Sequence, residues 1–156
     1  MSRTTPATLA LDKAGVAYSL ATYDYDPNAE RVGLQAAEAL GVPPREVLKT
    51  LMVRADGKPA CVVLASDREV AMKRLAAALG AKSAEMMKPA DAERMTGYRV
   101  GGVSPFGQKR QVPTVIDADA AALPEAFVNA GRRGLQARLA PADLVRLLGA
   151  TVAAVS

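Results

Sequence analysis

Residues 48–65 read LKTLMVRADGKPACVVLA, two apolar runs joined by a short polar turn. The runs 48–53 and 60–65 are rich in Leu and Val and have the length of buried strands. Asp56-Gly57 between them is a dipeptide typical of two-residue hairpin turns, because it tolerates the positive φ angles that these turns require. This stretch therefore predicts a β-hairpin.

The segments on either side of the hairpin predict short helices and short strands in irregular order. Thr5 and Pro6 predict a helix start, with Thr5 as N-cap, and Gly15 is expected to follow the helix end. Further helices are expected at 34–40, 44–46, 72–79, 89–96 and 141–148, strands at 18–25, 84–86, 112–116, 127–128, 135–139 and 151–155, and a loop with a helical turn at 119–125. This order argues against a regular βαβ repeat. It predicts an α+β (mixed α/β) fold, with a small barrel-like mixed sheet and peripheral helices.

Length and composition predict one domain over residues 1–156. A chain of 156 residues buries roughly two-thirds of the surface that its unfolded form exposes. Half of the residues are hydrophobic but only 4% are aromatic, so the core is expected to consist mainly of Ala, Val and Leu. The sequence has neither an apolar run of about eighteen residues nor the pattern of a signal peptide. We therefore expect no membrane association and a cytoplasmic location.

The sequence contains no histidine, which excludes several kinds of active site. Ser-His-Asp and Cys-His arrangements cannot be built, and no zinc-binding cluster is visible, so we expect neither a metal nor a cofactor. Cys61 is the single cysteine and lies in an apolar run, where we expect a packed, unreactive thiol. Catalysis would have to use Lys, Tyr, carboxylates, backbone amides, water or the substrate itself.

The net charge of +4 is modest. It fits contact with a polyanion such as a nucleic acid without requiring one. Arg132 and Arg133 lie between Gly131 and Gly134, where they could contact a phosphate backbone. A solvated loop explains the same pattern equally well.

Lys49 is the first candidate for chemistry, because it interrupts an apolar run. Burying a lysine among Leu48, Leu51 and Val53 is unfavourable unless the ammonium has a partner. In a strand, Lys49 would share a face with Leu51 and Val53. The alternative is an edge-strand lysine that points to solvent and opposes aggregation.

The second candidate is the stretch Gly101-Gly102-Val103-Ser104-Pro105-Phe106-Gly107-Gln108-Lys109. Its glycines can expose backbone amides, and its spacing is not that of a phosphate-binding Walker A loop. An amide loop beside Lys49 would form a site for an anionic or carbonyl-bearing ligand, whereas the alternative is a plain turn. The hydroxyls of Tyr23 and Tyr25 could orient that ligand, unless both tyrosines are amphipathic strand residues.

Several segments in one order carry a resemblance to a known family. They are Thr22-Tyr23-Asp24-Tyr25-Asp26-Pro27, Val47-Leu48-Lys49-Thr50-Leu51, Ala78-Leu79-Gly80-Ala81-Lys82, Thr96-Gly97-Tyr98, the stretch 101–109, Pro113-Thr114-Val115-Ile116-Asp117 and Gly131-Arg132-Arg133-Gly134-Leu135. The chain resembles the YbaK family of free-standing aminoacyl-tRNA deacylases over nearly its whole length. That family is similar to the editing domain inserted in bacterial prolyl-tRNA synthetases.

The resemblance implies a mixed α/β fold and hydrolysis of a wrongly attached amino acid, most often cysteine, from tRNA(Pro). It implies that Lys49 is the essential lysine and that Tyr23 lines the pocket, and Thr50 of the same Lys-Thr-Leu motif is counted with the substrate-binding residues. The loop that would hold the aminoacyl-adenosine end contributes Gly101, Gly102, Ser104, Pro105, Phe106 and Gly107.

The chain departs from the family pattern at three positions. Tyr25 stands where members often have histidine, Val32 where they often have a bulky aromatic residue, and Gln136 where they often have aspartate. Val32 and Gln136 are expected near the amino-acid pocket, so they bear on substrate choice. A contact of about one methylene changes discrimination by only about 1–3 kcal/mol.

The expected partner is aminoacylated tRNA(Pro), and the modest basic excess favours presentation of the tRNA by a prolyl-tRNA synthetase. Water or, in a cysteine ester, the substrate's own thiol would be the nucleophile. Two other functions remain open: a non-catalytic module that binds tRNA or a synthetase, and a regulator that binds a small ligand. Lys49 together with the 101–107 loop favours the enzyme. The amino acid edited and the oligomeric state do not follow from the sequence.

Overall fold

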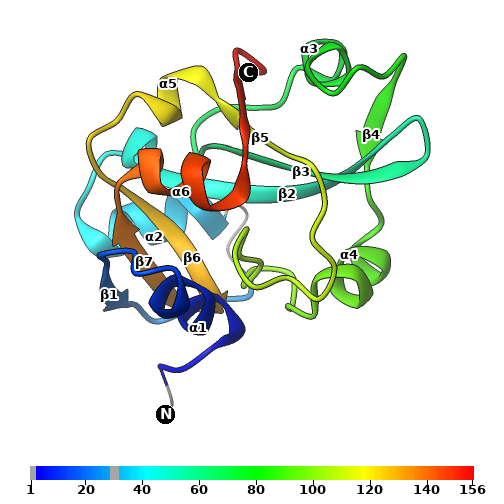
Figure 1. Cartoon of the computed structure of the whole chain (residues 1–156). Coiled ribbons are helices and arrows are strands. Elements are labelled where there is room, and N and C mark those ends of the chain that lie inside the picture. Colours follow the sequence, from blue (N-terminus) through cyan, green and yellow to red (C-terminus); the bar gives the residue numbers. More distant parts are fainter. Residues whose placement is uncertain (1–2, 29–31) are drawn as a thin grey trace.

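The computed structural model describes residues 3–28 and 32–156. Its elements are α1 (Pro6–Lys13), β1 (Ser19–Thr22), α2 (Val32–Leu40), the 3-10 turn η1 (Pro44–Glu46), β2 (Val47–Ala55), β3 (Lys58–Ala65), α3 (Met72–Ala78), β4 (Ala84–Met86), α4 (Pro89–Thr96), β5 (Thr114–Asp117), α5 (Ala118–Ala121), β6 (Ala126–Arg132), β7 (Leu135–Leu139), α6 (Pro141–Leu148) and β8 (Thr151–Ala153). Together they form the mixed α/β fold that the sequence predicts (Figure 1).

The predicted hairpin is confirmed as β2 and β3, and its strands are slightly longer than expected. Asp56 and Gly57 have φ angles of 50° and 79°, and a type I′ turn requires positive φ at both central residues. The ladder closes at Ala55 opposite Lys58 and extends to Leu48 opposite Ala65. The hairpin is therefore built from local turn chemistry and two apolar runs.

The hairpin lies in the middle of a mixed sheet. The strand order is β1-β7-β6-β2-β3-β5-β8, and β4 also pairs with β2. β2 runs parallel to β6, and β3 runs parallel to β5, although the hairpin itself is antiparallel. Segments about fifty and eighty residues apart in the sequence thus meet side by side, and the predicted mixed sheet is confirmed.

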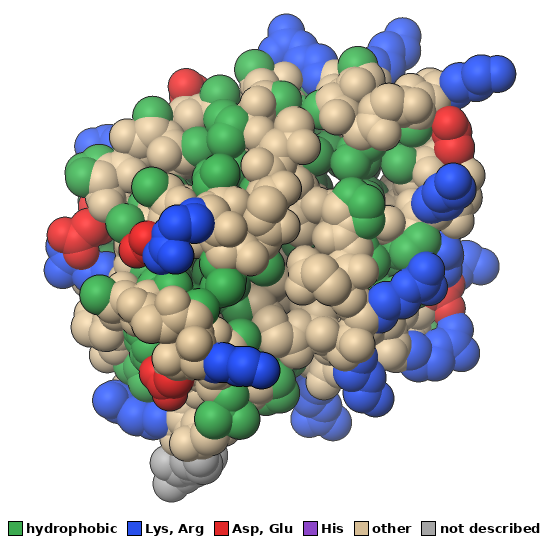
Figure 2. Space-filling view, viewed as in Figure 1, with side chains coloured by type: hydrophobic (Ala, Val, Ile, Leu, Met, Phe, Trp, Pro, Cys, Tyr) green, Lys and Arg blue, Asp and Glu red, His purple; other side chains and the backbone are tan. Residues whose placement is uncertain are grey.

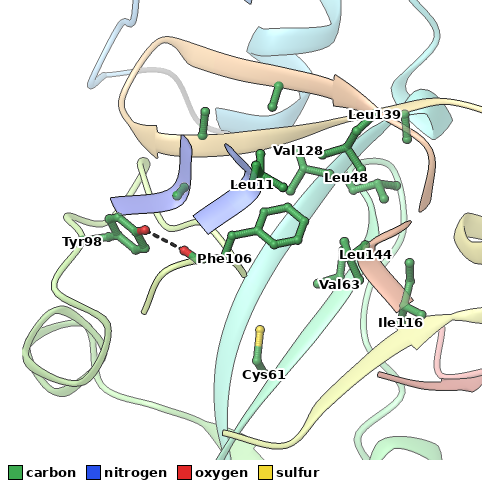
Figure 3. Close-up of a cluster of buried hydrophobic side chains, with 14 of the residues drawn as sticks. Leu11, Leu48, Cys61, Val63, Tyr98, Phe106, Ile116, Val128, Leu139 and Leu144 are labelled. Carbon is green, nitrogen blue, oxygen red and sulfur yellow. Dashed lines mark hydrogen bonds between the residues drawn. The ribbon is translucent and has the colours of Figure 1, made fainter. Parts of the chain in front are cut away.

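Both faces of the sheet are buried. Leu48 and Met52 of β2 reach the larger core, whereas Val53 packs in a smaller core with Leu75 of α3. Neighbouring strand residues point to opposite faces, so one strand contributes to both cores. Figure 3 shows the larger core, in which Phe106 points toward Leu11 and Leu48.

Outside the hairpin, four strand predictions differ from the structure in their ends: the strand expected at 112–116 is β5 at 114–117, the one expected at 151–155 ends at Ala153, and β1 and β6 differ most. β1 is shorter than the predicted strand 18–25, because its ladder with β7 ends at Thr22 and the Tyr23 amide already bonds the Gly134 carbonyl at 3.0 Å. β6 is longer than the predicted strand 127–128, because it stays paired with β7 across an irregularity between Asn129 and Arg132. Tertiary pairing decides both ends.

The helix starts follow the predicted capping chemistry. Thr5 caps α1, since its hydroxyl accepts the Thr8 amide at 3.0 Å, and Pro6 follows it. α4 and α6 each begin with a proline and end before a glycine in the left-handed conformation. No helix in the described residues is long and apolar enough to cross a membrane.

Lysine and arginine side chains gather on the side of the molecule that carries α4 and β4 (Figure 2). A groove there is lined by Arg54, Arg94, Lys109 and Arg110 around Asp91. Asp91 forms ion pairs with Arg54, at 3.7 Å, and with Arg94. Two of the four cations therefore pair with Asp91, and part of the basic excess is concentrated beside α4.

Candidate active site

A break in strand pairing along β2 opens the sheet. On one edge, β2 pairs with β6 at Val47 and Leu48 and with β4 from Val53 onward. Among the described residues no strand pairs with 49–52 on this edge, although β3 pairs with all of them on the other. A cavity of about 390 Å³ lies at the break, which is within the usual size range of small-molecule sites.

The cavity collects residues from segments that are far apart in the sequence. It is lined by Val47, Leu48, Lys49, Thr50, Leu51, Met52, Ser66, Asp67, Arg68, Glu69, Met86, Met87, Pro89, Ala92, Val100, Gly101, Val103, Asn129 and Gln136. Four of the residues expected from sequence are brought together here, namely Lys49, Thr50, Gly101 and Gln136. Most of the others form an apolar wall around this small polar group.

Lys49 lies in the interior of the sheet and not in an edge strand. It sits opposite Leu64 of β3, and its side chain is half-buried at the cavity. Leu51 and Val53, two and four residues further along the strand, pack in the smaller core. β2 as a whole is not an edge strand, because β6 and β3 flank it in the sheet, but at Lys49 only β3 is paired among the described residues and the other edge opens onto the cavity.

Two buried polar atoms of the cavity lining, Thr50 Oγ1 and Gln136 Oε1, have no hydrogen-bond partner among the described residues, and neither has the hydroxyl of Tyr23 beside Gln136. Burial raises the pKa of the Tyr23 phenol, and the adjacent Gln136 side chain lowers it in part. The two side chains are thus neighbours, although they are not placed for a hydrogen bond of ordinary geometry. Native proteins satisfy most buried polar atoms, so this group is suited to a polar ligand.

The 101–107 loop reaches the cavity only at its beginning. Ser104, Pro105 and Phe106 are buried, and Phe106 is only 1% exposed within the larger core. Its carbonyl accepts the Tyr98 hydroxyl at 2.6 Å (Figure 3), and its amide bonds the Ser104 hydroxyl at 3.2 Å. The structure places Gly107 against Pro6 of α1 and not at the cavity. This half of the loop anchors the half that faces the cavity.

The two glycines at the start of the loop are required for close packing. A Cβ atom on Gly101 would lie 2.5 Å from the Tyr25 hydroxyl, and one on Gly102 would lie 2.8 Å from the backbone nitrogen of Arg133. Gly101 also has a φ of 91°, which disfavours other residues. The loop, the Tyr23–Tyr25 segment and the turn after β6 are therefore in direct contact.

Gly102→Ala tests whether a glycine is required for this close packing. The added methyl group meets backbone, which cannot rotate away, so we expect a loss of about 1–3 kcal/mol in the free energy of unfolding. Urea denaturation measures the loss, and Gly57→Ala is a poor control because of its positive φ. Gly57→Ala therefore serves to measure the cost of a positive φ alone, because its added methyl group would meet no atom within 4 Å. A Gly102→Ala protein as stable as the parent would contradict the packing role.

Asn129 is a site residue that the sequence analysis missed. Its amide nitrogen donates to the carbonyls of Gly101, at 3.3 Å, and Arg132, at 3.2 Å. Its side-chain oxygen accepts the amides of Gly131, at 2.7 Å, and Arg132, at 3.2 Å. Asn129 thereby joins the loop to the irregular end of β6. A buried-strand pattern interrupted by one asparagine before Gly131 is the signal that could have indicated it.

Two residues expected at the pocket, Tyr23 and Val32, are not among the described residues that line the cavity. Tyr23 follows β1 and does not line the cavity, but it lies beside Gln136, which does. Val32 begins α2, but its side chain lies outside the described residues.

The Cys61 thiol is buried, and burial raises its pKa to about 12, so the prediction of a packed thiol is confirmed. Within residues 3–28 and 32–156, no group of three His, Cys, Asp or Glu side chains could hold a metal ion.

Comparison with known proteins gives a family match and several relatives. The model of the family described as "Aminoacyl-tRNA editing domain" matches residues 26–147. A protein of Enterococcus faecalis named "Putative Cys-tRNA(Pro)/Cys-tRNA(Cys) deacylase EbsC" is 38% identical over 112 residues, which cover 71% of this chain and 68% of that protein. A proline–tRNA ligase of Acidithiobacillus ferrooxidans is 32% identical over 114 residues, 69% of this chain but 20% of the ligase.

Solved structures show the same fold. The crystal structure of the hypothetical protein APE2540 has a TM-score of 0.84 and 26% identity, and the match covers 97% of this chain and 99% of that one. A structure described as "a putative trans-editing enzyme for prolyl tRNA synthetase" has a TM-score of 0.82 at 22% identity and covers 99% of each chain. The second likeness bears on the fold alone.

Proposed function

This chain belongs to the aminoacyl-tRNA editing domain family, and we propose that it hydrolyses the ester bond of mischarged aminoacyl-tRNA, with Cys-tRNA(Pro) as its main substrate. The observation that carries the proposal is the cavity at the break in the sheet, where Lys49 and Gly101 meet. The likeness to a relative named for Cys-tRNA(Pro) and Cys-tRNA(Cys) supports the choice of substrate.

The reaction needs stabilisation of charge more than a strong protein nucleophile. A nucleophile bonds to the ester carbonyl carbon, the bond to the ribose oxygen breaks, and that oxygen leaves with a proton. Negative charge develops on the carbonyl oxygen in between, and fixed donors in a water-poor site stabilise it effectively. We assign the ammonium of Lys49 to the oxygens of the ester and the ribose. Backbone amides near Gly101 are assigned to the developing oxyanion.

The amino-acid part of the substrate would fill the rest of the cavity. Met52, Met87 and Val103 supply apolar walls for a small side chain. The Thr50 and Gln136 oxygens are acceptors without partners among the described residues, and they suit the α-ammonium group that every aminoacyl ester carries. Gln136 would then recognise the amino acid without adding a negative charge to the cavity.

Water or the substrate's own thiol would supply the nucleophile, since the chain has no histidine to activate a serine or cysteine. In a cysteine ester the thiol lies close to the carbonyl carbon. Its sulfur would form a cyclic thioester as the ribose oxygen leaves with the thiol proton, and water would then open that thioester to free cysteine. Attack by the thiol predicts faster cleavage of the cysteine ester than of serine and alanine esters. Equal rates for the three esters would rule out thiol assistance.

The decisive experiment is deacylation of tRNA(Pro) charged separately with Cys, Ala, Ser and Pro. We expect the cysteine ester to disappear fastest and the proline ester to survive, because the correct product must be spared. Release of the radiolabelled amino acid measures each rate. Faster turnover of the alanine or serine ester would keep the reaction and change the substrate.

A folded protein that cleaves none of the four esters would contradict an editing enzyme. Tight binding of the charged tRNA without turnover would then favour the non-catalytic binding module.

We propose that the reaction takes place in the cytoplasm, where tRNA is charged, and that a prolyl-tRNA synthetase presents the tRNA. Adding the synthetase to the deacylation assay tests the second point through an increased rate.

A further inference from the structure

Arg133 lies in the turn between β6 and β7, where its guanidinium is held from two sides. The guanidinium carbon is 5.1 Å from the centre of the Tyr25 ring, within the range of cation–π contacts. Its Nε donates to the Val100 carbonyl at 2.9 Å. The side chain is exposed, so this geometry is imposed by two specific contacts and not by burial.

These contacts place Arg133 at the rim of the cavity. Val100 and Gly101 line the cavity, and the Tyr25 hydroxyl lies so close to Gly101 that a Cβ there would be 2.5 Å from it. The backbone of Arg133 packs just as closely against Gly102. The side chains of Tyr25 and Arg133 therefore stand beside the part of the loop that faces the candidate substrate site.

The charge of Arg133 is not neutralised by an acidic side chain. Within the described residues, no carboxylate forms an ion pair with it. Arg138 provides the contrast, because it also stacks on an aromatic ring, that of Phe127 at 5.8 Å, but pairs with Glu125 at 3.0 Å. With Nε bonded to Val100, the two terminal nitrogens of Arg133 remain to bind an anion.

We propose that Arg133 binds the 5′-phosphate of the terminal nucleotide of the aminoacylated tRNA and that Tyr25 holds its guanidinium in place. The proposal rests on the proposed function, because the ester must lie in the cavity. The ribose of the terminal nucleotide lies between the ester and the 5′-phosphate. An ester in the cavity therefore places the phosphate at the rim. A guanidinium presents paired N–H donors that match phosphate oxygens, and stacking fixes its plane.

A pair of small substrates isolates this contact. They are the 3′-aminoacyl esters of adenosine and of adenosine 5′-monophosphate, which differ only in the phosphate. We expect Arg133→Gln to lower kcat/KM for the phosphorylated ester by roughly tenfold, since one charge-assisted hydrogen bond is lost, and to leave the other ester unchanged. Arg138→Gln, the matched control, should change neither. An equal loss on both esters, or no loss, would overturn the proposal.

Binding measurements test the contact between Arg133 and the phosphate independently of catalysis. Analogues in which an amide replaces the ester cannot be hydrolysed in the same way and can be titrated with or without the 5′-phosphate. Weaker binding of only the phosphorylated analogue to Arg133→Gln would support the contact even if the parent protein cleaved no ester. Equal affinities of parent and variant for that analogue would overturn it.

Tyr25 is a positioning residue in this proposal, and its variants give a second test. Tyr25→Leu removes the ring beneath the guanidinium, so KM for the phosphorylated ester should rise severalfold while kcat is maintained. Tyr25→Phe keeps the ring and should restore most of the lost affinity. A leucine variant that behaves like the parent on both esters would show that the stacking has no part in phosphate binding.

Discussion

Lys49→Ala is expected to lower kcat/KM for the hydrolysed aminoacyl-tRNA by about 100- to 1000-fold, a loss of the size that follows removal of one preorganised donor that stabilises charge in an active site. Lys49 is half-buried at the cavity, and β3 holds its backbone on one side while the other side opens onto the cavity. In the proposed mechanism its ammonium contacts the oxygens of the ester and the ribose. Single-turnover deacylation with the parent and variant side by side measures the effect.

Two further variants make the Lys49 result specific. Lys49→Met keeps an unbranched stem but removes the charge, so it should lose as much activity as Lys49→Ala while packing like the parent. Lys58→Ala removes an exposed lysine at the far end of the same hairpin and should leave the rate unchanged. Activity in Lys49→Met close to that of the parent would assign Lys49 a packing role and contradict the proposed mechanism.

Phe106→Ala is expected to reduce the free energy of unfolding by about 3–5 kcal/mol, the range for a buried phenylalanine replaced by alanine. Phe106 is 1% exposed and packs in the larger core with Leu11 and Leu48 (Figure 3). The measurement is urea denaturation followed by circular dichroism. Phe106→Leu restores much of the volume and should recover more than half of the loss.

The same pair of variants separates packing from substrate contact at Phe106. The family resemblance assigns Phe106 to a substrate-binding loop. In the structure Phe106 is buried in the larger core and does not line the cavity. At a temperature where both variants are folded, KM for the aminoacyl-tRNA should stay within about twofold of the parent, because the loss falls on stability and not on binding. A large rise in KM with little loss of stability would contradict the packing role and indicate that Phe106 contacts the substrate.

Sequence reasoning predicted the hairpin and the helix caps because each depends on neighbouring residues. Asp56-Gly57 specifies its turn, and Thr5-Pro6 specifies the start of α1. The loop at 101–107 was interpreted less well. Its glycines indicated exposed amides, whereas Gly102 is packed against the backbone at Arg133. A glycine required for close approach and a glycine required for exposed amides look the same in a sequence.

The sequence by itself determined the order and type of most elements, the burial of the hairpin and the exclusion of histidine chemistry. These follow from periodicity, turn residues and composition, which act over a few residues. Only the tertiary structure decided where β2 lacks a partner, because that break depends on where β6 and β4 stop pairing with it. It likewise decided that Asn129 fastens the loop at Gly101 and that Arg133 stacks on Tyr25. Such contacts join residues that are distant in the chain, and no local pattern encodes their distance in space.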